Sequence, residues 1–190
     1  MLNFNLNNKN IILCLKKKLM LKLETFTELD FDRLIDWFNS KKELTQFAAS
    51  LFKFPLTRNQ LFTYINTTDL YPYKIIHMES KKIIGHCELN FQNEIPRLSR
   101  ILIGDKQYKG KGYGKKTIKL MIDKILNLRP ETNKVDLRVF KWNDNAIKLY
   151  LKLGFKIIPN NTLTFNYSKN ETWVDVNMQK QLKYNLMIHH

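Results

Sequence analysis

The chain has 190 residues, of which 44% are hydrophobic and 26% charged, a composition that excludes a disordered polypeptide and suits one globular domain with a buried core. Lysine and arginine number 32 against 17 aspartates and glutamates, so the formal net charge is +15. Such a charge favours an anionic partner, which could be a nucleic acid, a membrane surface or a phosphorylated cofactor. AT-rich coding, which favours Lys and Asn codons, is an alternative source of the same bias.

The cysteines and histidines argue against a metal centre. Cys14 and Cys87 are far apart and form no C-x-x-C pair, which excludes a zinc ribbon and a disulfide framework. Apart from the terminal pair 189–190, which is native or the remnant of a tag, the only histidines are His77 and His86. Two histidines are too few for the usual ligand sets, so we expect no metal.

The N-terminal segment differs in composition from the rest. Residues 1–19 are rich in Asn and Lys, and a second methionine, Met20, opens a sequence that reads as the start of a domain. We expect 1–19 to be a weakly ordered extension, 20–182 a single domain and 183–190 a C-terminal tail. The apolar run 11–15 is too short for a secretory signal, and no run approaches the roughly 20 residues of a membrane-spanning helix. We therefore expect a cytoplasmic protein without a membrane segment.

Hydrophobic periodicity and turn signals predict the elements in chain order. The first half reads as a strand, three helical segments and three strands, at 21–25, 27–38, 41–50, 56–65, 73–79, 82–92 and 97–105. Thr27 and Thr57 stand where helix N-caps are expected. The strand 82–92 places His86, Glu88 and Asn90 on one face, because side chains alternate along a strand.

The second half continues as a helix, a strand, a helix and two closing strands. Apolar residues with helical spacing predict a buried stripe made of Ile118, Met121, Ile122, Ile125 and Leu126. A strand over 134–140 and a helix over 143–155 follow, with Gly154 in the C′ position, and the closing strands span 155–160 and 172–180. This order predicts one α/β domain in which helices flank a mixed central β-sheet.

The segment 107–116, QYKGKGYGKK, holds three of the six glycines and joins a strand to a helix. Lys115 and Lys116 lie in the first turn of that helix, where each exposed cation opposes the helix dipole by about 0.3–1 kcal/mol. A bound polyanion would reverse this cost, so the segment predicts an anion site at the helix start. Lys109 and Lys115 occupy glycine positions of the Walker A and dinucleotide patterns, which therefore do not match. A glycine-rich loop with solvated lysines remains the alternative.

Residues 109–114, KGKGYG, resemble the acetyl-CoA pyrophosphate loop Q/R-x-x-G-x-G/A of the GNAT superfamily of N-acetyltransferases, with Lys109 in place of the usual Arg or Gln. Downstream, residues 143–155 resemble the second cofactor motif of that family, N-x-x-A-x-x-L-Y-x-x-x-G-F. One helix and one strand separate the two motifs, as in the family. The resemblance covers about 21–182 and implies a single GNAT-like domain.

The resemblance also implies how acetyl-CoA would be held. Backbone N–H groups of the loop would bind its pyrophosphate, from Lys109, Gly110, Lys111, Gly112, Tyr113, Gly114 and Lys115. The preceding strand would pair with the pantetheine arm through Ile101, Leu102 and Ile103. The second motif would contact the cofactor through Asn143, Ala146 and Tyr150. Asn143 is also a good helix N-cap, and both roles are compatible.

The implied chemistry is direct attack of a primary amine on the thioester in a ternary complex. Tyr150 is the expected general acid, since a phenol is protonated at neutral pH, and its alternative is a core tyrosine. Glu88 is the first candidate for the general base, and His86, Glu94 and Asp105 compete with it. A water relay would make a single base unnecessary.

The acceptor is left open by the sequence: a protein N-terminus, a small amine and an aminoglycoside all remain candidates. The aromatic residues of the early helices suggest an apolar acceptor side or plain core packing, and they are Trp37, Phe38, Phe47 and Phe52. The net charge of +15 argues against polyamines as acceptors, because a cationic protein repels them. The rival classes are a non-catalytic acyl-CoA-binding domain and a basic nucleic-acid-binding module, although no nucleic-acid-binding motif is present. Dimers are common among similar proteins, so a homodimer is also open.

Overall fold

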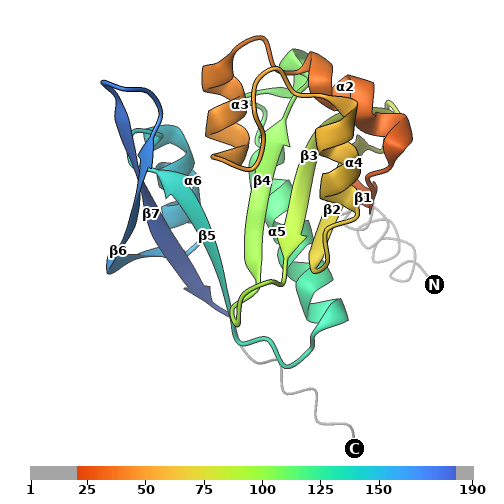
Figure 1. Ribbon diagram of the computed structural model, residues 1–190. Helices are drawn as coiled ribbons and strands as arrows, with labels where there is room; N and C mark the ends of the chain where they lie inside the picture. Colours follow the sequence, from red (N-terminus) through yellow and green to blue (C-terminus); the bar gives the residue numbers. More distant parts are fainter. Residues whose placement is uncertain (1–20, 183–190) are drawn as a thin grey trace, which may run out of the picture.

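In the computed structural model, which describes residues 21–182, one β-sheet organises the chain (Figure 1). Its strands are β1 Leu21–Thr25, β2 Leu70–His77, β3 Lys82–Asn90, β4 Arg97–Ile103, β5 Lys134–Phe140, β6 Lys156–Asn166 and β7 Thr172–Gln181. The helices are η1 Glu28–Asp30, α2 Phe31–Asp36, α3 Lys41–Ala48, α4 Arg58–Ile65, η2 Lys106–Tyr108, α5 Tyr113–Leu128 and α6 Asp144–Lys152. The expected extension 1–19 and tail 183–190 lie outside the described residues.

The strands lie in the order β1-β2-β3-β4-β5-β7-β6, and every neighbouring pair is antiparallel except β4 and β5, which run parallel. Helices pack on both faces of this sheet (Figure 1). The predicted α/β fold with a mixed central sheet is therefore confirmed. Within 21–182, no helix is long and apolar enough to cross a membrane.

Helix α5 covers one face of the sheet through the stripe that its sequence predicts. Ile118, Met121 and Ile125 are buried there among apolar side chains of β3, β5 and β7, whereas Ile122 and Leu126 are only partly buried at its margin. The stripe is narrower than predicted because the outer residues of a helical face meet solvent as well as the sheet.

The opposite face carries a second core made by the segment from η1 to α4. Phe31, Leu34, Leu44 and Leu61 are its fully or almost fully buried members. The N-cap expected at Thr57 is present, since its side chain accepts the N–H of Gln60 at 3.4 Å. These helices stand over the strands β3 and β4, and they place an aromatic cluster at the middle of the sheet (Figure 1).

Strands β4 and β5 are joined at one end only. The single pair in their register is Arg97 with Asp136, and beyond it the strands diverge (Figure 1). The joined end is fastened by an ion pair, because the Nε and Nη2 of Arg97 each lie 2.8 Å from an Asp136 oxygen, and Asn177 donates to the same carboxylate at 2.8 Å. This divergence opens a wedge in the sheet.

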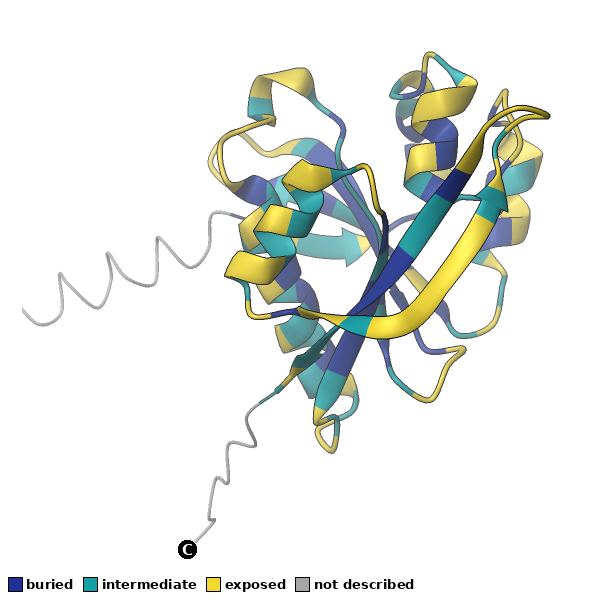
Figure 2. Ribbon diagram, turned by 90° about the vertical axis from the view of Figure 1, so that its left-hand side faces the viewer, coloured by how far each residue is buried: buried dark blue, intermediate teal, exposed yellow. Residues whose placement is uncertain are grey.

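Strand β6 is longer than the predicted 155–160, because it continues to Asn166 through an irregularity between Ile157 and Thr162. It lies at one edge of the sheet, and Figure 2 shows how exposed it is. An edge strand tolerates Pro159 and a bulge, since only one side has to pair with a neighbour.

Candidate active site

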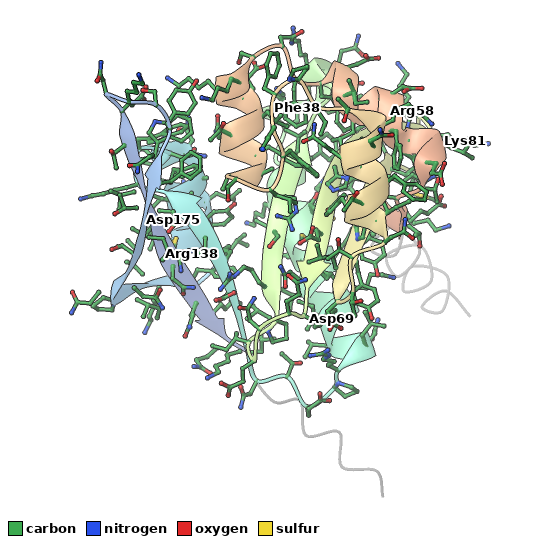
Figure 3. The ribbon with its side chains drawn as sticks, viewed as in Figure 1. Phe38, Arg58, Asp69, Lys81, Arg138 and Asp175 are labelled. Atoms are coloured by element: carbon green, nitrogen blue, oxygen red, sulfur yellow. The ribbon has the colours of Figure 1, made fainter. Side chains whose placement is uncertain are left out.

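A cleft of about 490 Å³ lies where β4 and β5 diverge. Strand β4 lines it, together with two opposed walls. The helical wall follows α2 and α3 and comprises Trp37, Phe38, Glu43, Gln46 and Phe47. The strand wall follows β5, β7 and α6 and comprises Arg138, Phe140, Asp175, Asn143, Ala146 and Tyr150. Figure 3 shows Phe38 on one side of the gap and Arg138 with Asp175 on the other.

The cleft brings together residues of both predicted cofactor motifs. Those that line it are Ile101, Leu102, Lys109, Asn143, Ala146 and Tyr150. The remaining predicted cofactor residues do not line it: they are Ile103, Gly110, Lys111, Gly112, Tyr113, Gly114 and Lys115. The two motifs are nevertheless adjacent, because a Cβ added at Gly114 would lie 3.5 Å from the side chain of Leu149 in α6. The loop therefore borders the cleft at its Lys109 end.

The loop has the geometry of an open anion cradle. Gly110 and Gly112 have φ of +73° and +80°, a conformation that glycine adopts without strain. Apart from the glycines themselves and their chain neighbours, no atom of the described residues lies within 4 Å of the two Cβ positions, so the backbone is accessible. No side chain caps α5, whose N-cap is Gly112, and the N–H groups of a first helical turn have no intrahelical acceptor. These features fit a pyrophosphate.

A chain of four side chains supports this loop. The Tyr113 hydroxyl lies 3.0 Å from Nε2 of His77, and Nδ1 of His77 lies 2.9 Å from the Ser80 hydroxyl. The Ser80 hydroxyl in turn lies 2.9 Å from the hydroxyl of Tyr108. Tyr108 ends η2 and Tyr113 begins α5, so these hydrogen-bonded side chains hold both ends of the loop against the turn after β2.

The backbone of β4 also fits its expected role. Within the part of the chain that the structure describes, β4 has no strand partner beyond Arg97 on the side of β5, and Ile101 and Leu102 line the cleft there. An extended ligand can add to an unpaired strand edge by backbone hydrogen bonds. This edge is where the pantetheine arm was expected.

Glu88, expected as the general base, is buried in an ion pair. Its side chain is fully buried, and its two oxygens each lie 2.5 Å from a nitrogen of Arg100, Nε and Nη2. Arg100 has φ of +50° and stands where the register of β3 and β4 shifts, so the pair holds a bulge in β4. Both carboxylate oxygens are thus occupied by the guanidinium of Arg100, and Glu88 does not line the cleft. The geometry argues for a positioning role.

The other candidate bases are also outside the cleft lining. His86 is fully buried, and burial, followed by the charge of Arg100, lowers its pKa to about 3, so the imidazole is neutral. Glu94 is exposed in the turn after β3. Asp105 caps η2 by accepting the N–H of Gln107 at 2.9 Å. Within 21–182, no group of three or more His, Cys, Asp or Glu residues could hold a metal ion.

Tyr150 lies on α6 and lines the cleft. Burial raises the pKa of its phenol to about 12, so the hydroxyl is protonated at neutral pH. The ring contacts Phe155, with centroids 6.0 Å apart, so the residue packs in the core and faces the cleft at once. Asn143 caps the same helix by accepting the N–H of Ala146 at 3.3 Å, as predicted.

Sequence reasoning missed several residues that line the cleft, among them Glu43, Gln46, Arg138 and Asp175. The Nε of Arg138 lies 3.0 Å from both oxygens of Asp175, and its Nη2 lies 2.5 Å from one of them. The two residues are 37 positions apart, and only the pairing of β5 with β7 brings them together. No local pattern in the sequence could have signalled them.

Known proteins resemble the chain in sequence and fold. Residues 20–156 match the family described as Acetyltransferase (GNAT) domain. A probable spermine N(1)-acetyltransferase of Bacillus subtilis subsp. natto is 40% identical over 72 residues, which are 38% of this chain and 45% of that protein. The chain thus matches less than half of the length of this relative.

Two solved structures share the fold. The spermidine N-acetyltransferase of Vibrio cholerae, in complex with CoA and spermine, has a TM-score of 0.68 at 19% identity, over 85% of this chain and 95% of that one. AAC(6')-Ib, in complex with ribostamycin and coenzyme A, has a TM-score of 0.68 at 18% identity, over 90% of this chain and 98% of that one. From its sequence over 20–156 and from its fold, the chain belongs to the GNAT acetyltransferase family.

Proposed function

We propose that the protein is an acetyl-CoA-dependent N-acetyltransferase that moves an acetyl group to a primary amine. The observation that carries the proposal is the cleft between β4 and β5, where Lys109 of the first motif meets Asn143, Ala146 and Tyr150 of the second. Two solved proteins of the same fold contain bound coenzyme A, which supports acetyl-CoA as the acetyl donor. Because their sequence identity to this chain is low, the likeness to them concerns the fold alone.

The chain offers separate positions for the parts of acetyl-CoA. The loop 109–115 would hold the pyrophosphate through backbone N–H groups, helped by the positive end of α5. The open edge of β4 at Ile101 and Leu102 would pair with the pantetheine arm, which directs the thioester toward Tyr150. Acetyl-CoA would supply the activated acyl group.

In the proposed reaction the neutral amine attacks the thioester carbon directly and forms a tetrahedral intermediate. As the C–S bond breaks, its electron pair goes to sulfur, and the Tyr150 hydroxyl donates a proton to the leaving thiolate. The amine loses its proton to water, because Glu88 is already bound to Arg100 and His86 is buried away from the cleft. Glu88 then acts by holding the β4 bulge.

A thiol-release assay with acetyl-CoA and a panel of amines tests the proposal. Wild type should release CoA with at least one amine, and Tyr150→Phe should lower kcat by about 10²–10⁴-fold while calorimetric CoA affinity stays within about twofold. CoA binding without turnover of any amine would favour the non-catalytic acyl-CoA-binding domain. Absence of CoA binding, with salt-sensitive binding of random DNA, would favour the nucleic-acid module. Cytoplasmic location and a homodimer remain predictions.

A further inference from the structure

We propose that Glu43 determines the choice of acceptor by binding a second cationic group, which an aliphatic chain separates from the reacting amine. The inference rests on the proposed function, and it names a specificity-determining residue and the substrate class of the same cleft. Three observations carry it: the charge balance of the cleft lining, the carboxylate of Glu43 and the apolar side chains beside it.

Most charges that line the cleft cancel in pairs. Three arginines of the lining are each bound to one carboxylate, and these pairs are Arg97 with Asp136, Arg100 with Glu88 and Arg138 with Asp175. Of the described residues that line the cleft, the charged ones outside these pairs are Lys109 and Glu43. The net charge of +15 is therefore a poor guide to the acceptor, because the cleft itself presents one further cation and one further anion.

Lys109 and Glu43 approach the cleft from opposite sides of the sheet. Lys109 belongs to the loop that leads into α5, and α5 covers one face. Glu43 belongs to α3, which packs on the other face through Leu44 and Ala48. The cleft between β4 and β5 is lined from both sides. Because the pyrophosphate is proposed to bind at the Lys109 end, Glu43 lies on the side that is left for the acceptor.

The carboxylate of Glu43 has one oxygen available to a ligand. Its Oε2 accepts the N–H of Asn39 at 2.8 Å, and Glu43 is exposed where it lines the cleft. Within 21–182, no second donor and no cation contacts this carboxylate. The bond to Asn39 holds the side chain in place, which lowers the cost of ordering it when a ligand binds. An ammonium group could donate to Oε1 in a charge-assisted hydrogen bond.

The neighbours of Glu43 in the cleft suit an alkyl chain. Glu43, Gln46 and Phe47 are three and four positions apart on α3, so they lie side by side on one face of the helix. The ring of Phe47 packs against that of Phe38 with centroids 4.9 Å apart, and Trp37 also lines the cleft. Methylene groups gain by leaving water against such rings, and the ring faces also attract an ammonium group. The lining therefore fits an aliphatic chain that ends in a cation.

The experiment compares pairs of acceptors of matched shape at saturating acetyl-CoA, equal pH and fixed ionic strength. In each pair a methyl group of the monoamine replaces the second amine of the diamine: pentylamine with 1,4-diaminobutane, and heptylamine with 1,6-diaminohexane. We expect kcat/KM for the diamine to exceed that for its monoamine at least about fivefold in one pair. Equal values in both pairs would overturn the inference and leave the proposed function intact. Thiol release with no amine would overturn the proposed function, and the inference with it.

Glu43→Gln tests the residue itself, because Gln can still accept the N–H of Asn39 while the charge is lost. The second ammonium group is bound alike before and during the reaction, so we expect KM for the diamine to rise about five- to tenfold. The value of kcat and the kinetics of the monoamine should stay almost unchanged. Glu94→Gln, the same change at an exposed residue outside the cleft lining, is the matched control.

Two results with this variant would overturn the inference. A fall in kcat for the monoamine and the diamine alike would show that Glu43 acts on the reacting amine and not on a second cation. Diamine kinetics equal to those of Glu94→Gln, in a variant with wild-type thermal stability, would show that the charge of Glu43 does not contribute to acceptor choice.

Discussion

The hydroxyl of Tyr113 lies 3.0 Å from Nε2 of His77, so the first residue of α5 is tied to the last residue of β2. The contact is buried, and the two rings meet edge to face with centroids 5.3 Å apart. It fixes the start of α5 relative to the sheet, and with it the direction of the N–H groups proposed to bind pyrophosphate.

Tyr113→Phe removes this hydrogen bond while the ring stays in place. A net hydrogen bond is worth about 0.5–1.5 kcal/mol, so we expect the KM for acetyl-CoA to rise about two- to tenfold with kcat almost unchanged. Steady-state kinetics and CoA calorimetry measure the two effects. Tyr71→Phe, at an exposed tyrosine outside the site, is the control. Equal changes in both variants would contradict a positioning role for Tyr113.

Gly112→Ala should weaken acetyl-CoA binding and destabilise the protein together. At φ of +80° a side chain costs about 1–2 kcal/mol, and its Cβ would enter the open space of the loop. Gly112→Asn separates the two effects, because Asn tolerates this conformation better and obstructs the loop equally. We expect Asn to restore most of the thermal stability and little of the affinity for acetyl-CoA. Restored affinity would argue against close approach of a ligand to this backbone.

Glu88→Gln distinguishes a positioning residue from a general base. Breaking a buried ion pair leaves Arg100 uncompensated, so we expect the free energy of unfolding to fall by about 3–5 kcal/mol and kcat to fall with it. The acidic limb of the pH profile of kcat/KM should keep its shape, because in the proposed reaction the amine gives its proton to water and not to Glu88. Loss of that limb at unchanged stability would restore Glu88 as the base.

His86 should make stability depend on pH on the acid side. Its pKa is lowered to about 3 by burial, so between that value and the unfolded-state value near 6.5 the unfolded chain binds the proton and the folded chain does not. The contribution of His86 to the free energy of unfolding is complete above about pH 6.5 and falls as the pH decreases, by about 1.6 kcal/mol between pH 6.5 and 5. Urea unfolding of wild type and His86→Gln measures the difference. A variant as acid-sensitive as wild type would contradict it.

Local patterns predicted most of the fold. The helical stripe around Ile118 and Met121, the caps at Thr57 and Asn143 and the positive φ of Gly154 all depend on residues within a few positions of one another. The extension of β6 was missed, because an edge strand accepts a bulge and Pro159 that look like an end in the sequence.

The candidate site was predictable only in its cofactor half. The motifs around Lys109 and Asn143 are continuous segments, so the residues that each one contributes to the site can be recognised together in the sequence. Glu88 and Arg100 are 12 positions apart on neighbouring strands, so the alternation of β3 could place Glu88 on a face without showing which cation it meets. Asp175 reaches the cleft through strand pairing alone.

Among residues 21–182, the ion pair of Arg97 with Asp136 lies at the single register pair that joins β4 to β5. One half carries β1 to β4 with the helical wall, and the other carries β5, β7 and β6 with the strand wall. The separation of the two walls thus depends in part on a pair of residues that belongs to neither motif, although Arg97 itself lines the cleft. Substitutions of wall residues can change the preferred amine while acetyl-CoA remains the donor. A substitution of Arg97 or Asp136 would instead alter the recognition of both substrates together.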